Sequence, residues 1–176
     1  LYCIGLHGPD ILFYYGPLSS NRVNAVGHEL HARSGRCFFE NARRVVRGSR
    51  KPQAALAYAY GALSHFALDV ACHPYVDEKI AASGVTHTRI EVEFDRSLML
   101  SDGLNPVTHV LTDHIRPARA NAEIVAPFYP GVTARQAERA LRSMIFYNQV
   151  LLARTDGKRK LLYAALRAAG KYQQLS

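Results

Sequence analysis

Cysteines and long apolar segments are both scarce in this sequence, and each absence excludes a class of protein. Only Cys3, Cys37 and Cys72 occur in 176 residues, and so small and odd a number excludes a disulfide-held scaffold. No segment approaches the roughly 20 consecutive apolar residues of a membrane-spanning helix. The start at Leu1 has no basic segment ahead of an apolar one, so no signal peptide is visible. The expected location is therefore cytoplasmic or undetermined, without a transmembrane segment.

An initiator methionine, internal repeats and alternating strands are also absent. Because residue 1 is Leu, we expect either that the natural chain contains residues ahead of it or that such residues are removed by processing. A length of 176 residues with 48% hydrophobic content suits one domain, residues 1–176, with a substantial core. No segment alternates apolar and polar residues as a half-buried strand does, so a β-rich fold is excluded.

Acidic residues are fewer than basic ones, 14 against 22, and the formal net charge is +8. A basic surface favours contact with nucleic acid or with an anionic membrane surface. The one dense basic cluster, residues 43–51, is typical of a solvated helix end, where cations suit the helix dipole.

The apolar periodicity and the Gly and Pro positions predict an all-α fold of five to seven helices. Gly48-Ser49 and Pro74 are expected to end two helices, because the residue before a proline avoids helical geometry. Thr133 and Gln136 form a capping-box pattern. The expected helices cover residues 21–46, 52–73, 86 to about 98, 105–115, 133–152 and 156–170, with a Pro-rich loop over 116–132.

Histidines and carboxylates recur at helical intervals in the middle of the chain. His65, Asp69 and His73 are four residues apart, and His87 and Glu91 repeat that interval fourteen residues further on. Side chains four apart lie on one face of a helix, with Cβ atoms about 5–6 Å from one another. Imidazole and carboxylate are donors that zinc accepts, although iron or manganese could use the same set.

A network of hydrogen-bonded polar side chains is the alternative to a metal site here. The helix that carries His65 is mostly apolar, and we expect it to be buried on most sides. Buried imidazoles and carboxylates are costly unless they are paired or bind metal, which favours the metal site. The apolar residues in question are Ala55, Leu56, Ala59, Ala62, Leu63, Phe66, Ala67, Val70 and Ala71.

Three further positions extend this set of candidate ligands. Asp10 follows Gly8-Pro9 in a rigid turn, and His28 and His31 are neighbours on the predicted helix 21–46. Each also has an ordinary interpretation, as a turn residue or a surface histidine. Cys72 is a soft ligand or a small buried residue. His7, His109 and His114 lack a carboxylate at helical spacing and are left out.

Taken in order, these residues resemble the ligands of the zinc-dependent phospholipase C family, whose helical fold is shared by zinc-dependent single-strand nucleases. The most specific matches are the run 64–69, SHFALD, and the interval from His73 to His87. The resemblance covers roughly residues 5–100 and points to a bacterial branch with GPDILFYY near the start. It implies a compact multi-helix fold with a metal cluster between helices. The residues concerned are Asp10, His28, His65, Asp69, His73, His87 and Glu91.

The resemblance also assigns ligands. It implies one zinc on Asp10, His28, His65 and Asp69, a second on His73, His87 and Glu91, and Asp69 bridging to a third. In the family, the mature N-terminal residue and a His soon after it help to hold the third zinc. This sequence shows no such pair, so two or three ions are expected. The interval from Asp10 to His28 is longer than usual, which leaves His31 as a substitute.

The implied activity is metal-dependent hydrolysis of phosphodiester bonds, with phospholipid as the expected substrate. A single-strand nuclease on the same scaffold and a non-catalytic metal-binding module are the alternatives. The expected catalytic residues are Asp10, as general base, and Asp69. Asp95 is either a hydrogen-bond partner of a ligand imidazole or solvated. The aromatic run 13–15 either lines the cleft or belongs to the core.

Overall fold

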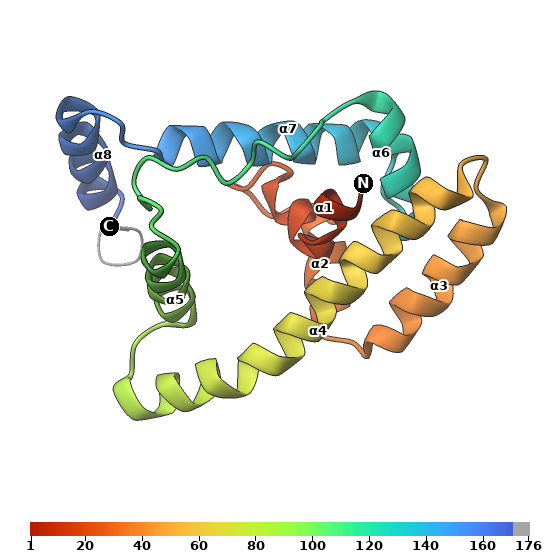
Figure 1. Cartoon of the computed structure of the whole chain (residues 1–176), viewed down its shortest axis with the longest axis horizontal. Helices are drawn as coiled ribbons and strands as arrows, with labels where there is room; N and C mark the ends of the chain where they lie inside the picture. The colour runs from red at the N-terminus through yellow and green to blue at the C-terminus, as the bar shows by residue number, and fades with distance from the viewer. Residues whose placement is uncertain (171–176) are drawn as a thin grey trace. The chain divides into compact units, whose positions relative to one another are not determined.

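The computed structural model describes residues 1–170, and every regular element in that range is a helix (Figure 1). This confirms the predicted all-α class. The elements are α1 (Tyr2–Gly5), η1 (Gly8–Tyr14), α2 (Arg22–His31), α3 (Gly35–Gly48), α4 (Pro52–Ser83), α5 (His87–Ser101), α6 (Arg119–Val125), η2 (Ala126–Phe128), α7 (Ala134–Leu151) and α8 (Asp156–Ala168). None of these helices is both long and apolar enough to cross a membrane.

Internal contacts divide the chain into two units. Unit 1 contains Leu1–Leu68 and Thr112–Tyr147, and unit 2 contains Asp69–Leu111 and Asn148–Ser176. The assignment of residues 1–176 to a single domain stays a prediction.

Local side-chain caps explain where several helices begin. The Thr133 hydroxyl accepts from the Gln136 N–H at 3.3 Å, and Gln136 Oε1 accepts from the Thr133 N–H at 2.8 Å. This reciprocal pair confirms the predicted capping box ahead of α7. Asn21 caps α2 by accepting from two backbone N–H groups. Thr155, one residue before the expected Asp156, caps α8.

Two predicted helix boundaries were wrong. The single helix expected over 21–46 is divided into α2 and α3, because Ser34 adopts a non-helical conformation and its hydroxyl accepts from the Arg36 N–H. Pro74 does not end α4, which continues to Ser83. A proline inside a helix removes one backbone hydrogen bond, and here the residues on both sides keep the helical conformation.

Two predictions for residues 105–132 were also wrong. Asn105 starts only a turn, in which its side chain accepts from the Val107 N–H at 2.9 Å, and no helix follows up to residue 115. The expected loop over 116–132 contains α6 and η2, because the prolines flank α6 rather than interrupt it.

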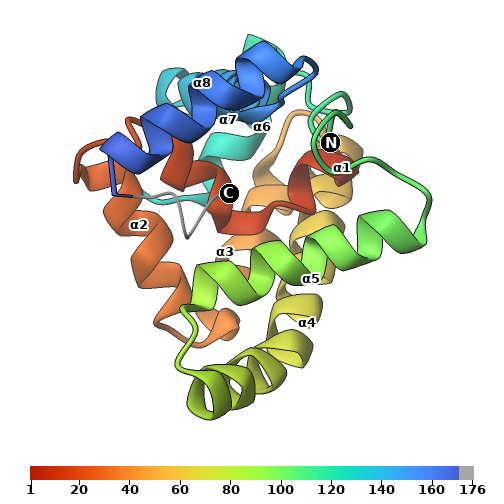
Figure 2. The ribbon, with the colours of Figure 1, turned by 90° about the vertical axis from the view of Figure 1, so that its left-hand side faces the viewer.

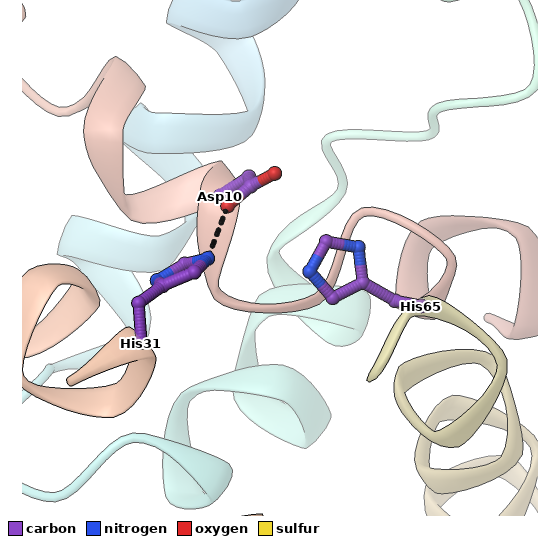
Figure 3. Close-up of side chains that lie close together, drawn as sticks. All are labelled: Asp10, His31 and His65. Carbon is purple, nitrogen blue, oxygen red and sulfur yellow. Dashed lines mark ion pairs between the residues drawn. The ribbon is translucent and has the colours of Figure 1, made fainter. Parts of the chain in front are cut away.

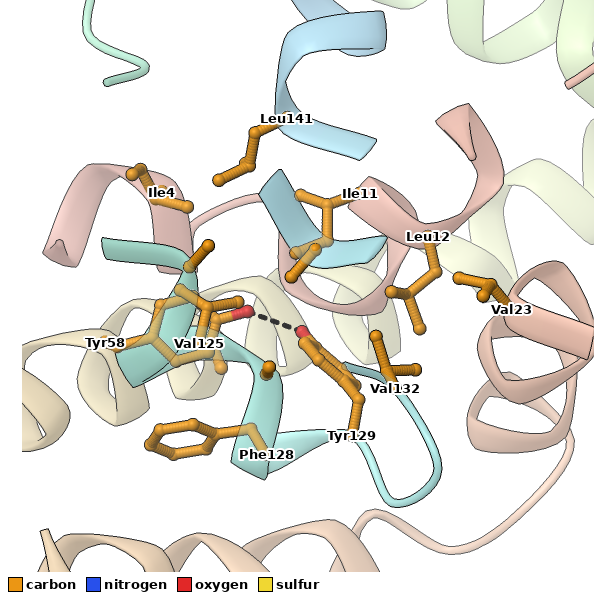
Figure 4. Packing of buried hydrophobic residues seen from close by; sticks show 14 of the residues in the cluster. Ile4, Ile11, Leu12, Val23, Tyr58, Val125, Phe128, Tyr129, Val132 and Leu141 are labelled. Carbon is orange, nitrogen blue, oxygen red and sulfur yellow. Dashed lines mark hydrogen bonds between the residues drawn. The ribbon is translucent and has the colours of Figure 1, made fainter. Parts of the chain in front are cut away.

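Unit 1 has a continuous apolar core (Figure 4). A stripe of α4 with Ala55, Tyr58 and Ala62 faces this core, and α7 adds Ala137 and Leu141. Among its largest fully buried side chains are Tyr58, Tyr129, Phe128, Ile11, Leu12, Leu141 and Val125. The core therefore fixes η1 against α4, and η1 carries Asp10.

The α4 helix is not buried on most sides, which corrects the expectation from its composition. Leu56, Leu63 and Phe66 are among its exposed side chains, because only the stripe facing the core is covered. Gly61 lies within that stripe, and a Cβ atom there would collide with the Tyr2 carbonyl oxygen. The missing side chain lets α1 approach the α4 backbone closely.

Unit 2 contains the second half of α4, then α5, and α8 near its end. A short connection with Gly84 in the left-handed conformation joins α4 to α5 (Figure 2). The Ala153 N–H donates to the Val107 carbonyl at 2.9 Å, which ties the two chain segments of this unit together. Among the described residues of unit 2, Val76 and Met99 are the buried hydrophobic side chains.

Candidate metal centre

The first group of metal donors, here called the first donor group, is formed by Asp10, His31 and His65 in unit 1 (Figure 3). The residues come from η1, the end of α2 and α4, and their ligand atoms lie within 4.8 Å of one another. Asp10 Oδ1 is 2.9 Å from His31 Nε2, and the two side chains are 43% and 30% exposed. Three chain segments thus direct donors to one solvent-accessible point.

A backbone contact orients the His31 ring. Its Nδ1 lies 2.8 Å from the Gly27 carbonyl oxygen, so Nδ1 donates and Nε2 is directed toward Asp10. Histidines that bind metal commonly donate their second N–H in this way, because the contact fixes the tautomer and ring direction. The Phe13 ring also stacks on His31, with centroids 5.3 Å apart.

Two buried tyrosines hold the segment that presents Asp10. The Tyr129 hydroxyl donates to the Gly8 carbonyl at 2.7 Å, and Tyr58 contacts the Tyr129 hydroxyl at 2.6 Å. Burial raises the pKa of both phenols above their usual range, so both remain protonated donors. Gly8 has a φ of +50°, and a Cβ atom there would collide with the His65 ring. Only glycine fits this position without strain.

The second group of metal donors, here called the second donor group, is formed by His73, Asp77 and His87 in unit 2. The His73 and His87 ring centroids are 5.1 Å apart. His73 Nε2 lies 3.1 Å from Asp69, and His87 Nε2 lies 2.8 Å from Glu91. Two of the i,i+4 pairs predicted from the spacing, Asp69 with His73 and His87 with Glu91, are therefore present, each as a histidine facing a carboxylate.

The structure brings His31, and not His28, to Asp10 and His65. The His28 ring instead contacts Phe13, with centroids 4.7 Å apart. The role of His28 as a ligand stays a prediction, as do those of Asp69 and Glu91. The sequence reasoning missed Asp77, although its spacing of four residues from His73 is the signal that identified the other pairs.

His7 and His114, which sequence reasoning left out, form a pair in unit 1. Their Nε2 atoms are 2.8 Å apart and their rings are stacked at 5.1 Å with a 7° interplanar angle. Burial, followed by repulsion from His114, lowers the pKa of His7 to about 4. A separation of 107 residues in the chain leaves no local pattern from which this pair could have been found.

The remaining candidates are placed as follows. Burial, followed by repulsion from Glu91, raises the pKa of Asp95, and its role as a hydrogen-bond partner of a ligand imidazole stays a prediction. Tyr14 and Tyr15 pack against the core, and Arg139 lies over the Tyr15 ring at 5.1 Å. Phe13 is the member of the aromatic run that contacts the first donor group.

The donor types in both groups fit zinc. Each group offers two imidazoles and one carboxylate, a set that zinc accepts in proteins. Three of the four histidines, His31, His73 and His87, also have a carbonyl or carboxylate partner close to a ring nitrogen. An all-helical chain with two such donor groups has the features of a helical metal-binding protein.

Comparison with known families agrees with this class. The family model described as "Zinc dependent phospholipase C" matches residues 1–140, which include both donor groups. The chain therefore belongs to the zinc-dependent phospholipase C family. No curated protein and no solved structure matches the chain.

Proposed function

We propose that the protein is a zinc-dependent hydrolase of phosphodiester bonds whose preferred substrate is a phospholipid. The observation that carries this proposal is the pair of His/carboxylate donor groups within the part of the chain that matches the family. We assign one zinc to Asp10, His31 and His65 and another to His73, Asp77 and His87. The preference for phospholipid over nucleic acid rests on the family alone.

The side chains of this protein would contribute position and proton transfer. When bound, zinc supplies Lewis-acid chemistry, which withdraws charge from phosphate oxygens and makes water a better nucleophile near neutral pH. Asp10 Oδ1 faces His31, and the second carboxylate oxygen can accept a proton from the attacking water. No serine or cysteine nucleophile is required. Asp69 would hold the His73 ring in place through the contact at Nε2.

The ligand assignment is tested by measuring bound zinc in purified variants. His31→Ala should lose the zinc of the first donor group, whereas His28→Ala, one helical turn away, should retain it. Asp77→Asn should weaken binding at the second donor group. Loss of zinc in His28→Ala with full retention in His31→Ala would restore the assignment that the sequence favoured.

The activity is tested with three substrates, each with and without a chelator. These are phosphatidylcholine vesicles, bis(p-nitrophenyl) phosphate and single-stranded DNA. We expect chelator-sensitive release of phosphocholine, with slower cleavage of DNA. Asp10→Asn should reduce turnover more than Asp95→Asn, because only Asp10 lies in a donor group. Faster cleavage of DNA would favour the nuclease, and zinc-loaded protein that cleaves none of them would be a non-catalytic binding module.

A further inference from the structure

The Phe13 ring contacts both histidines of α2. Its centroid is 4.7 Å from that of His28 and 5.3 Å from that of His31, with interplanar angles of 35° and 29°. His31 belongs to the first donor group, and His28 does not. One aromatic ring therefore touches the histidine that faces Asp10 as well as the histidine that lies away from it.

The backbone that carries Phe13 is tied to the first turn of α2 by Asn24. This side chain is only 8% exposed. Its Nδ2 donates to the Leu12 carbonyl at 2.8 Å, to the Phe13 carbonyl at 3.3 Å and to the Tyr15 carbonyl at 3.0 Å. Leaving these carbonyls without their buried donor would be costly. The end of η1, and with it the Phe13 ring, is thus held against α2.

Gly27 provides the space in which the Phe13 ring packs. A Cβ atom at Gly27 would lie 2.8 Å from Phe13 Cε1, whereas non-bonded carbon atoms pack at about 3.5–4.0 Å. The Gly27 carbonyl also accepts from His31 Nδ1 at 2.8 Å. His31 is consequently held twice, by the carbonyl at one ring nitrogen and by the Phe13 ring on its face.

We propose that Phe13 is a positioning residue that selects His31, rather than His28, as the zinc ligand supplied by α2. The two histidines are three residues apart, so only about 60° separates them around the helix. Helical spacing alone does not decide between them. Stacking on Phe13 keeps His31 Nε2 at 2.9 Å from Asp10, and the contact of His28 with the same ring keeps that histidine aside.

This selection rests on the zinc assignment made under the proposed function and adds the residue that decides the ligand. The His31 side chain is 30% exposed, so without lateral contacts it would populate several rotamers. Only some rotamers direct Nε2 to Asp10. Mutating a residue that orients a metal ligand without touching the metal typically weakens metal binding by 10–100-fold.

Zinc titrations of four full-length proteins test the selection: the unmodified chain, Phe13→Leu, His31→Ala and the double variant. The imidazole nitrogen NMR signals of His65 report zinc at the first donor group in each. Phe13→Leu keeps most of the apolar volume and should weaken this zinc by about tenfold or more. His31→Ala should cost less in the Phe13→Leu background, because His28 can then turn toward Asp10. Equal costs in both backgrounds, or unchanged affinity in Phe13→Leu, would overturn the proposal.

Two further variants separate ring position from general packing. Gly27→Ala displaces the Phe13 ring without removing it, and it should also weaken zinc at the first donor group. Phe39→Leu is the matched control, because this half-buried ring packs edge-on against Phe66, with centroids 5.6 Å apart. It should bind zinc like the unmodified protein. Equal weakening by Phe39→Leu and Phe13→Leu would contradict a specific role for Phe13.

A measurement on metal-free protein separates this proposal from the zinc assignment. At a pH where the ring is neutral, nitrogen NMR should show His31 as the tautomer with its proton on Nδ1. Phe13→Leu should convert it into a mixture of both tautomers. If zinc binds at His65 and the His31 tautomer does not respond to Phe13→Leu, the proposal alone fails. If the unmodified protein shows no zinc at His65, the zinc assignment fails and the proposal fails with it.

Discussion

The two units hold their donor groups in different ways. In unit 1, Asp10 and His65 lie on elements that the apolar core fixes, and buried tyrosines hold the Gly8 backbone beside them. In unit 2, the described residues bury only Val76 and Met99, and the donors lie on helices that are largely exposed. The same donor chemistry is thus placed once on a packed scaffold and once on a loosely packed one.

This difference shows what each group needs in order to keep its geometry. The ion pairs of Asp69 with His73 and of Glu91 with His87 are partly solvated, and such pairs stabilise a fold by at most about 1 kcal/mol. Hydrophobic burial in unit 1 contributes roughly 25 cal/mol for each Å² of apolar surface. We therefore expect unit 1 to keep its structure without metal, and unit 2 to depend on metal for local order.

The largest expected effect is that of zinc on unit 2. Zinc at 1,000 times its dissociation constant stabilises the state that binds it by about 4 kcal/mol. Amide hydrogen exchange in α5 should therefore accelerate by up to about a thousandfold after chelation, while exchange in α7 changes much less. Equal acceleration in both helices would remove the distinction between the units.

A pair of truncations measures the same contrast in packing. Leu141→Ala in the core of unit 1 should lower the free energy of unfolding by about 2–5 kcal/mol, because it leaves a cavity. Leu98→Ala in unit 2 removes the same atoms from a side chain that is 50% exposed, and it should cost less than about 1 kcal/mol. Denaturant unfolding of the two variants is the measurement. Comparable losses would mean that Leu98 is covered in solution.

The pair of Tyr58 and Tyr129 should link the packing of the core to the zinc affinity of the first donor group. Tyr129→Phe leaves the Gly8 carbonyl without its donor, at a cost of about 1–3 kcal/mol in unfolding free energy. Zinc binding at the first donor group should weaken too, and binding at the second should not. Tyr58→Phe is the control, because the contact between Tyr129 and Gly8 remains. Unchanged zinc affinity in Tyr129→Phe would limit the pair to a structural role.

The smallest expected effect is acid sensitivity from His7. The pKa of His7 is about 4 in the folded protein, below its usual value of 6.5, so the unfolded chain binds the proton more readily. Stability is unaffected above pH 6.5 and declines as the pH falls from 6.5 toward 4. In metal-free protein, His7→Gln should reduce the loss of melting temperature between pH 7 and pH 5 by a few degrees. An equally steep loss in the variant would assign the sensitivity to other groups.

Features that depend on local sequence were predictable, and features that depend on distant contacts were not. The stripe from Asp69 to His73 and the capping box at Thr133 follow from helical spacing alone. The choice between His28 and His31 depends on how η1 packs against α2, which no local pattern encodes. Likewise, the sequence shows that α4 is rich in apolar residues. Which of them are buried depends on the neighbours that cover the helix, and Phe66 remains exposed.

The ultraviolet absorbance of the buried tyrosine pair can be used to follow the unfolding of unit 1. Phenolate formation changes the absorbance of tyrosine, and the chain contains ten tyrosines. Because burial raises the pKa of Tyr58 and Tyr129, these two should remain un-ionised in alkaline solution after exposed phenols have titrated. The phenolate absorbance of Tyr58 and Tyr129 should therefore appear at higher pH than that of the other tyrosines. Its appearance would show, without an added label, when the core around the Gly8 backbone unfolds.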